Sequence, residues 1–201
     1  MTPDPAETVH LSPAEIWYMY KTKILTYAGI TAAVLVIAIA YQVHGYLSTS
    51  GSQELYAKAH TIADFQKVIQ EYPGTPVAGN AALQLAEKLR AEKKFDEALS
   101  VLRNFVEKYP THPLAPGGWT SIAATYEMQG KLDEALKAND SAISKYPDSY
   151  ATPIAMMSQA RIYLVQGKKN EARHLYEDVK VRYGQSIYAQ EAARNLHFIK
   201  K

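Results

Sequence analysis

The chain of 201 residues contains no cysteine. This excludes disulfide frameworks, thiolate metal sites, thiol nucleophiles and an anchor attached to a lipid-modified cysteine. An excess of one charge is also missing, because 22 basic side chains face 20 acidic ones and the formal net charge is only +2. Nucleic-acid-binding proteins usually concentrate basic side chains on one face, since phosphate neutralisation supplies most of their affinity. Nucleic acid is therefore not an expected partner.

Motifs that carry catalysis are absent from the sequence as well. There is no Gly-rich phosphate loop, no nucleophile elbow and no HExxH pattern, and the six histidines are scattered without a pair four residues apart. Paired carboxylates such as Asp96–Glu97 and Asp133–Glu134 fall where helices are expected to start. We therefore expect no enzyme activity, no metal site, no cofactor and no small-molecule substrate.

One long apolar run is present near the N-terminus. Residues 24–43, from Ile24 to Val43, read ILTYAGITAAVLVIAIAYQV and include no charged side chain. At about 1.5 Å rise per residue, a helix of this length spans about 30 Å, the thickness of a bilayer's hydrocarbon core. The run predicts a single transmembrane helix, preceded by an N-terminal segment over residues 1–23 in which the helix already starts.

The start of this helix has its own signature. Ser12 is expected to be the N-cap, with Pro13 at the first helical position and Glu15 reaching back to the amide of the cap. Leu11 and Ile16 are expected to pack together across the junction as a hydrophobic staple.

The lysines around the apolar run predict its orientation. Lys21 and Lys23 precede it, whereas no Lys or Arg follows until Lys58. The positive-inside rule then places residues 1–23 in the cytoplasm and everything after residue 47 on the other side of the inner (plasma) membrane, in the periplasm. A cleaved signal peptide is the alternative, because Ala38-Ile39-Ala40 resembles a cleavage site. Retention as an anchor is favoured, since the apolar run exceeds the usual 7–15 residues of a signal peptide.

The rest of the sequence contains an internal repeat. Tyr-Pro pairs at 72–73, 109–110 and 146–147 recur every 37 residues, and Tyr183-Gly184 follows at the same step. Each of the three units predicts two helices with apolar residues at helical spacing. Gly130 and Gly167 are expected to end the first helix in a left-handed conformation, and Lys93 takes that place in the first unit.

These units resemble the tetratricopeptide repeat family. In the middle unit the pattern of large and small residues typical of the family falls on Trp119, Ile122, Ala123, Tyr126, Ala135, Asn139, Ala142 and Pro147. Asn139 departs from the pattern, because an apolar residue is usual there. The period is longer than the common 34 residues, as in repeats of bacterial cell-envelope proteins. The resemblance implies an all-α fold, an α-solenoid of about three repeats plus flanking helices, over residues 53–201 after a linker at 44–52.

The resemblance also implies a binding groove formed by the first helices of successive units. Met157 and Arg161 are expected to be its central anchors. Some chaperone-binding members of the family bind the C-terminal carboxylate of a partner with Lys and Asn. Leu83 and Glu87 occupy those positions here, so binding of a C-terminal carboxylate in this way is not expected. The groove positions carried over from the family are Asn80, Leu83, Glu87, Arg90, Thr120, Ala124, Glu127, Met128, Ile154, Met157, Arg161 and Leu164.

Three functions fit this layout. A single span with a periplasmic repeat domain resembles the YfgM-type ancillary subunits of the bacterial Sec translocon, which implies secreted chains, chaperones or a membrane complex as protein partners. An accessory structural subunit of a membrane enzyme complex is the second interpretation, because Gly29 and Ala33 give the span a small-residue face. A scaffold for cell-envelope assembly or division is the third.

Overall fold

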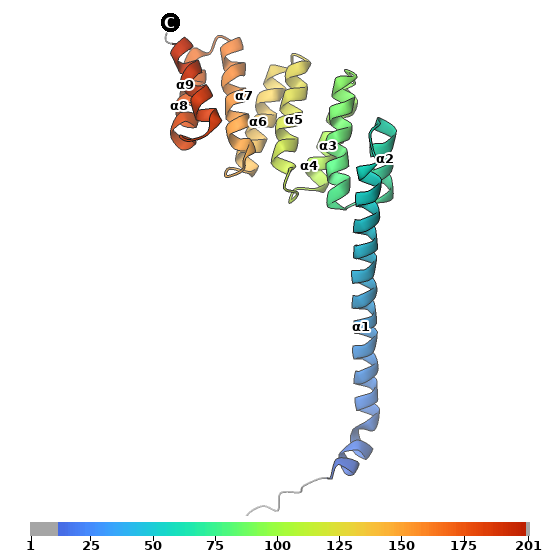
Figure 1. The fold of residues 1–201 in the computed structure, drawn as a ribbon. Helices are drawn as coiled ribbons and strands as arrows, with labels where there is room; N and C mark the ends of the chain where they lie inside the picture. The colour runs from blue at the N-terminus through green and yellow to red at the C-terminus, as the bar shows by residue number, and fades with distance from the viewer. Residues whose placement is uncertain (1–11, 200–201) are drawn as a thin grey trace, which may run out of the picture. The chain divides into compact units, whose positions relative to one another are not determined.

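A computed structural model describes residues 12–199, without the side chains of residues 24 and 41–49. Over this range the chain forms nine helices, and it divides into two compact units, Met1–Ser48 and Thr49–Lys201 (Figure 1). The helices are α1 (Pro13–Ala57), α2 (Ile62–Glu71), α3 (Pro76–Ala91), α4 (Phe95–Lys108), α5 (Ala115–Met128), α6 (Leu132–Lys145), α7 (Ala151–Val165), α8 (Lys169–Arg182) and α9 (Ile187–Ile199).

The predicted start of α1 is confirmed. The amide of Ser12 donates to Oε2 of Glu15 over 2.8 Å, and the amide of Glu15 donates to Oγ of Ser12 over 3.3 Å. This reciprocal capping box satisfies amides that have no partner within the helix. Leu11, and with it the predicted staple to Ile16, lies outside the described residues.

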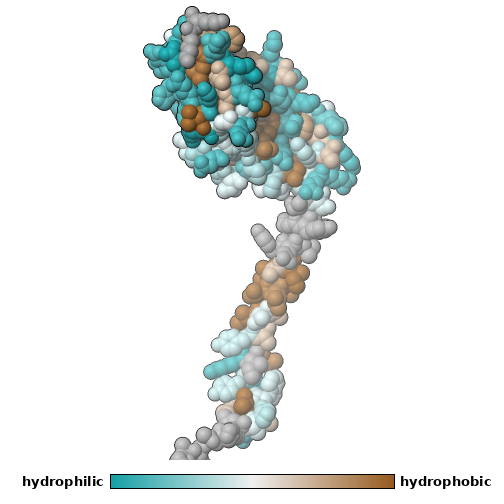
Figure 2. Space-filling model, turned by 60° about the vertical axis from the view of Figure 1, so that its left-hand side comes forward, coloured by the Kyte–Doolittle hydropathy of each residue, from teal (hydrophilic) through white to brown (hydrophobic). Residues whose placement is uncertain are grey.

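The first unit exposes the apolar part of α1. Every described side chain over residues 12–40 is exposed, and Figure 2 shows hydrophobic side chains gathered along this helix. Among the described residues no single helix meets the length and composition needed to cross a bilayer. The segments Pro13–Lys23 and Leu25–Ala40, bent by 56° from each other, meet these requirements together. The bend falls beside Ile24, where the sequence places the start of the span.

Helix α1 continues into the second unit. Residues 44–52, which the sequence assigns to a linker, are helical, and the division between the two units falls among them, between Ser48 and Thr49.

The second unit is the predicted stack of helical hairpins. Consecutive helices from α2 to α9 pack against one another, and α5 and α7 also make contact across neighbouring hairpins (Figure 1). The three hairpins α3–α4, α5–α6 and α7–α8 coincide with the three repeat units. The prediction of an all-α solenoid with flanking helices is therefore confirmed, with α2 before the hairpins and α9 after them.

The turn inside each hairpin needs one left-handed residue. Gly130 has a φ of 73° and Gly167 a φ of 76°, as predicted, and Lys93 takes the same conformation with a φ of 61°. A side chain disfavours this region, and the first hairpin therefore forms its turn at some cost in stability.

Small residues allow the helices to approach closely. The alanines of the repeat pattern are at most 1% exposed, and a Cβ added to Gly118 would lie 2.7 Å from Cγ1 of Val106. Five of the six alanines belong to two core clusters, one around Leu102 and Phe105 and one around Tyr176 and Val179. The alanines in question are Ala86, Ala98, Ala123, Ala135, Ala160 and Ala172.

Hydrogen bonds between neighbouring hairpins repeat with the sequence. Nε2 of Gln129 donates to Oδ1 of Asp96 over 3.0 Å, and one repeat later Nε2 of Gln166 donates to Oδ1 of Asp133 over 3.1 Å. The two aspartates thus join α4 to the end of α5 and α6 to the end of α7. The sequence alone places Asp96 and Asp133 only at helix starts, and the structure gives their carboxylates a role in joining neighbouring helices.

Ala123 and Ala124 provide a test of the packing. Ala123 is 1% exposed, whereas Ala124 is partly exposed and lines a depression described below. Ala123→Leu is expected to destabilise the protein by about 1–3 kcal/mol, because extra side-chain volume overpacks the core. Ala124→Leu should have a clearly smaller effect. Thermal unfolding followed by circular dichroism measures both, and equal shifts in the two midpoints would contradict the assigned register.

Candidate protein-binding face

The first helices of the hairpins, α3, α5 and α7, form two depressions on one side of the stack, together with α9. We call this surface the inner face and define it by the residues that line the two depressions. Most of these residues come from the helices on which the sequence places the groove.

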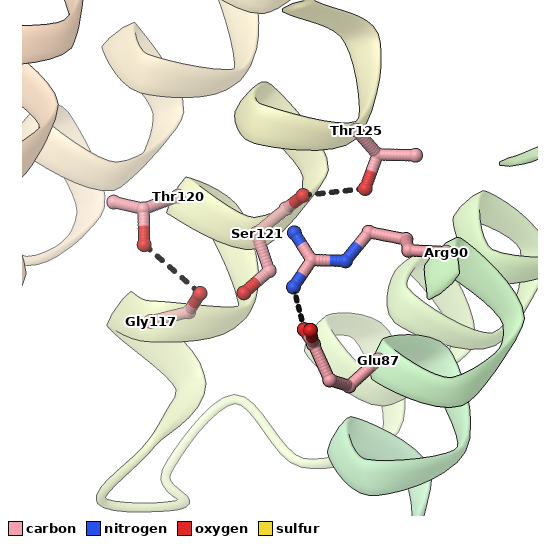
Figure 3. A network of polar contacts seen from close by, with 6 residues as sticks. All are labelled: Glu87, Arg90, Gly117, Thr120, Ser121 and Thr125. Atoms are coloured by element: carbon pink, nitrogen blue, oxygen red, sulfur yellow. Dashed lines mark hydrogen bonds and ion pairs between the residues drawn. The ribbon is translucent and has the colours of Figure 1, made fainter. Parts of the chain in front are cut away.

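The first depression lies between α3 and α5 and has a volume of about 240 Å³. Arg90 of α3 forms an ion pair with Glu87, and its guanidinium points toward Ser121 of α5 (Figure 3). The side chain of Arg90 is only 18% exposed, and its Nε has no hydrogen-bond partner. Because this Nε is itself buried, its missing hydrogen bond costs free energy.

Two threonine hydroxyl groups of α5 form hydrogen bonds within the helix. Oγ1 of Thr120 donates to the carbonyl of Gly117 over 3.0 Å, and Oγ1 of Thr125 donates to the carbonyl of Ser121 over 2.7 Å (Figure 3). Tyr150 closes the depression, and burial raises the pKa of its hydroxyl.

The second depression lies between α5, α7 and α9 and has a volume of about 220 Å³. Its apolar lining includes Ala124 and Ile154, and its charged lining includes Glu127, Arg161 and Glu191. Such a surface offers apolar contact beside both signs of charge.

A polar network extends from this depression into the core. Nη2 of Arg161 lies 2.7 Å from Oε2 of Glu127, and Oγ of Ser158 donates to Oε1 of the same carboxylate over 2.6 Å. Nδ2 of Asn139, which is 0% exposed, donates to Oγ of Ser158 over 2.8 Å. The Oδ1 atom of Asn139 is buried without a partner, which costs free energy. Asn139, which departs from the family pattern, is thus part of a hydrogen-bond network beneath the second depression.

The structure brings nine of the twelve predicted groove residues to the inner face. The other three lie elsewhere. Met128 is 55% exposed outside the depressions, Leu164 packs against the second core cluster, and Asn80 is partly buried beside the stack. The nine are Leu83, Glu87, Arg90, Thr120, Ala124, Glu127, Ile154, Met157 and Arg161.

Met157 lines the second depression but has little exposed surface. Its side chain is only 7% exposed and belongs to the second core cluster, together with Ala192 and Leu196 of α9. Closure of the stack by α9 buries it, which the pattern of a single repeat could not show. Arg161, one turn further on, has a side chain that is 61% exposed.

The residues proposed for the membrane are only partly described. Ala33 is exposed, and a Cβ added to Gly29 would meet no atom within 4 Å. The side chains of Ile24 and Val43 lie outside the description.

Several residues of the inner face were not predicted from the sequence. Ser121, Ser158, Tyr150, Tyr188 and Glu191 line the depressions. Only the unusual Asn139 gave a signal, because a polar residue at an apolar position requires a partner. Among the described residues, no three His, Asp or Glu side chains come together as metal ligands.

These features define a helical-repeat scaffold. The chain belongs to the family with a tetratricopeptide repeat-like domain, and the match covers residues 16–192. Such repeat domains are typically non-catalytic and bind other proteins. No curated protein sequence matches the chain significantly.

Solved structures with the same fold are distant in sequence. MamA protein is 17% identical with a TM-score of 0.55, over 76% of this chain and 82% of that protein. TPR-like repeats from Podosopora anserina are 16% identical with a TM-score of 0.55, over 79% and 84%. A thermophilic TPR protein of Thermus thermophilus is 18% identical with a TM-score of 0.50, over 67% and 71%. At these identities the likeness shows the fold alone.

Ser158 provides a test of the polar network. Ser158→Ala removes the partner that joins Asn139 to Glu127 and leaves the buried amide of Asn139 without an acceptor. We expect a loss of about 1–3 kcal/mol in the free energy of unfolding. Ser144→Ala, on the exposed side of α6, is the matched control. Equal denaturation midpoints for the two variants would show that the network contributes nothing to stability.

Proposed function

We propose that the protein is a membrane-anchored, non-enzymatic adaptor whose inner face binds a segment of another protein. The observation that carries this proposal is the pair of depressions on successive first helices, each with an ion pair beside apolar side chains. Polar anchors set between apolar contacts suit a peptide segment, because its backbone carbonyls and side chains need both.

Arg161 is the best candidate for a binding anchor. Its guanidinium is the more exposed partner of the ion pair, since 61% of its side chain is accessible compared with 19% for Glu127. The partly buried carboxylate of Glu127 accepts from Ser158 and from Arg161, and it therefore orients the guanidinium. An oriented guanidinium loses little conformational freedom when it binds a carbonyl or carboxylate of a partner.

The exposed apolar helix supports membrane anchoring. All described side chains from 25 to 40 are exposed, and these residues include no charged side chain. Such a surface needs an apolar environment, and a bilayer supplies one. The family match begins at residue 16 and thus includes this helix together with the repeats.

Lys21 and Lys23 support a cytoplasmic N-terminus and a periplasmic repeat domain on the inner (plasma) membrane. This layout is similar to that of the YfgM-type ancillary subunits of the Sec translocon. We propose secreted chains, their chaperones or a membrane complex as partners.

An accessory structural subunit of a membrane enzyme complex is the second candidate. It is favoured by the open space beside Gly29, which would let another helix approach closely at Gly29 and Ala33. In that case the span, rather than the inner face, would carry recognition.

The orientation can be tested with a reporter fused after Lys201. A reporter that is active only outside the cytoplasm is expected to work, because the lysines before the span favour retention of the N-terminus inside. Activity of a cytoplasmic reporter at the same position would contradict the proposal. Intact mass of the membrane-extracted protein distinguishes an anchor from a cleaved signal, since cleavage after Ala40 would leave a chain that starts at Tyr41.

Binding by the inner face can be tested with Arg161→Glu in the full-length protein. Reversal of this exposed charge is expected to lower the recovery of co-purifying proteins at least about tenfold, as for a central interface anchor. The melting midpoint should change little, because an exposed ion pair contributes at most about 1 kcal/mol.

The matched control is Lys137→Glu, which reverses an exposed charge on α6 outside the two depressions. It should retain the partners. If Arg161→Glu retains them too, and replacement of residues 24–43 by an unrelated span releases them, the structural-subunit candidate replaces the adaptor.

A further inference from the structure

A third depression lies on the opposite side of the hairpins, between the second helices. It is formed by α2 and α4 above α3 and has a volume of about 350 Å³. Its apolar lining includes Ile69, Leu85, Val101 and Phe105, and Ala82 of α3 contributes only a methyl group. We call this depression the outer pocket. It shares no residue with the inner face.

The sequence repeat explains why the outer pocket is open. Position 82 corresponds to Trp119 one repeat later and to Met156 two repeats later. The ring of Trp119 packs against the first core cluster, and Met156 is buried in the second. In those hairpins a large side chain therefore occupies the place that Ala82 leaves empty. The outer pocket therefore lies where a tryptophan side chain at position 82, equivalent to Trp119, would lie.

The charge at the rim follows the same repeat. Lys108 is the one charged side chain that lines the outer pocket among the described residues, and no carboxylate lines it. Lys145 occupies the equivalent position in the next hairpin, where its Nζ lies 4.8 Å from the centre of the Trp119 ring. This is a cation–π geometry. Lys108 is therefore placed to contact the face of an aromatic ring in the same manner.

We propose that the outer pocket is a docking site for one exposed tryptophan side chain of a partner protein. The ring would take the place that Trp119 holds in the next hairpin, with the apolar floor beneath it and Lys108 above it. The electron-rich face of an indole complements the single cation of the rim. An aliphatic side chain would fill the floor but would leave the cation without this contact.

The absence of cysteine makes the proposal directly testable by disulfide exchange in the full chain in detergent micelles. Ser100 is an exposed residue on the wall of the outer pocket, and Lys137 is its exposed equivalent in the hairpin that Trp119 fills. Ser100→Cys and Lys137→Cys each introduce the only thiol. Each variant is equilibrated with a mixture of indolylethyl, cyclohexylethyl and ethyl disulfides, and intact mass measures the products.

At Ser100→Cys the indolylethyl adduct is expected to exceed the ethyl adduct by roughly tenfold, because the ring is buried. It should also exceed the cyclohexylethyl adduct by about two- to fivefold, because of the cation. Adding Lys108→Gln should abolish the second preference only. At Lys137→Cys neither preference is expected, and this control also accounts for partition of the probes into micelles.

Equal adduct ratios at the two positions would overturn the proposal. A preference for indole over cyclohexyl that survives Lys108→Gln would overturn the assignment to an aromatic ring held by this cation. A second test fills the pocket from within. Ala82→Trp is expected to raise the melting midpoint and to remove both preferences when combined with Ser100→Cys. A lowered midpoint together with unchanged adduct ratios would show that the pocket does not accept a tryptophan.

Discussion

Close approach between neighbouring helices is the interaction on which the structure depends. A single hairpin cannot bury its own apolar side, so each repeat packs that side against the next repeat. Alanine at the recurring contact positions, and glycine at position 118, let backbones come near enough to exclude water. The left-handed turns and the hydrogen bonds to Asp96 and Asp133 hold neighbouring helices in the same relative position in successive repeats.

The same constraint decides where function can reside. Residues at the contact positions are buried between helices, so a partner can be recognised only on the two exposed sides of the stack, which carry the inner face and the outer pocket. On the inner face, the repeat pattern is broken by polarity, since Asn139 replaces an apolar residue and is bonded to Ser158. At the outer pocket, the departure from the pattern is one of side-chain size, since the small Ala82 lies where the next repeat has Trp119. A departure from the repeat is thus the informative signal at both places.

The helices, their order and most inner-face positions were predictable because the period of the repeat determines which residues share a side. The turn at Lys93 and the alanine contacts followed from the same alignment. The burial of Met157 could not be predicted, because it depends on α9, a helix outside the three units. The role of Ser158 could not be predicted, since hydrogen bonds between different helices depend on side-chain positions that no periodicity encodes.

The division of the core into two clusters has a consequence for cooperativity. Helix α6 contributes Ala138 to the first cluster and Ile143 to the second, and the polar Asn139 lies between them. A buried amide with an unpaired oxygen costs free energy at this boundary, and we therefore expect the helices beyond it to open more easily than the whole domain. A partner bound across α5, α7 and α9 would hold the boundary closed. Recognition would then be coupled to the local folding equilibrium of the C-terminal part of the stack.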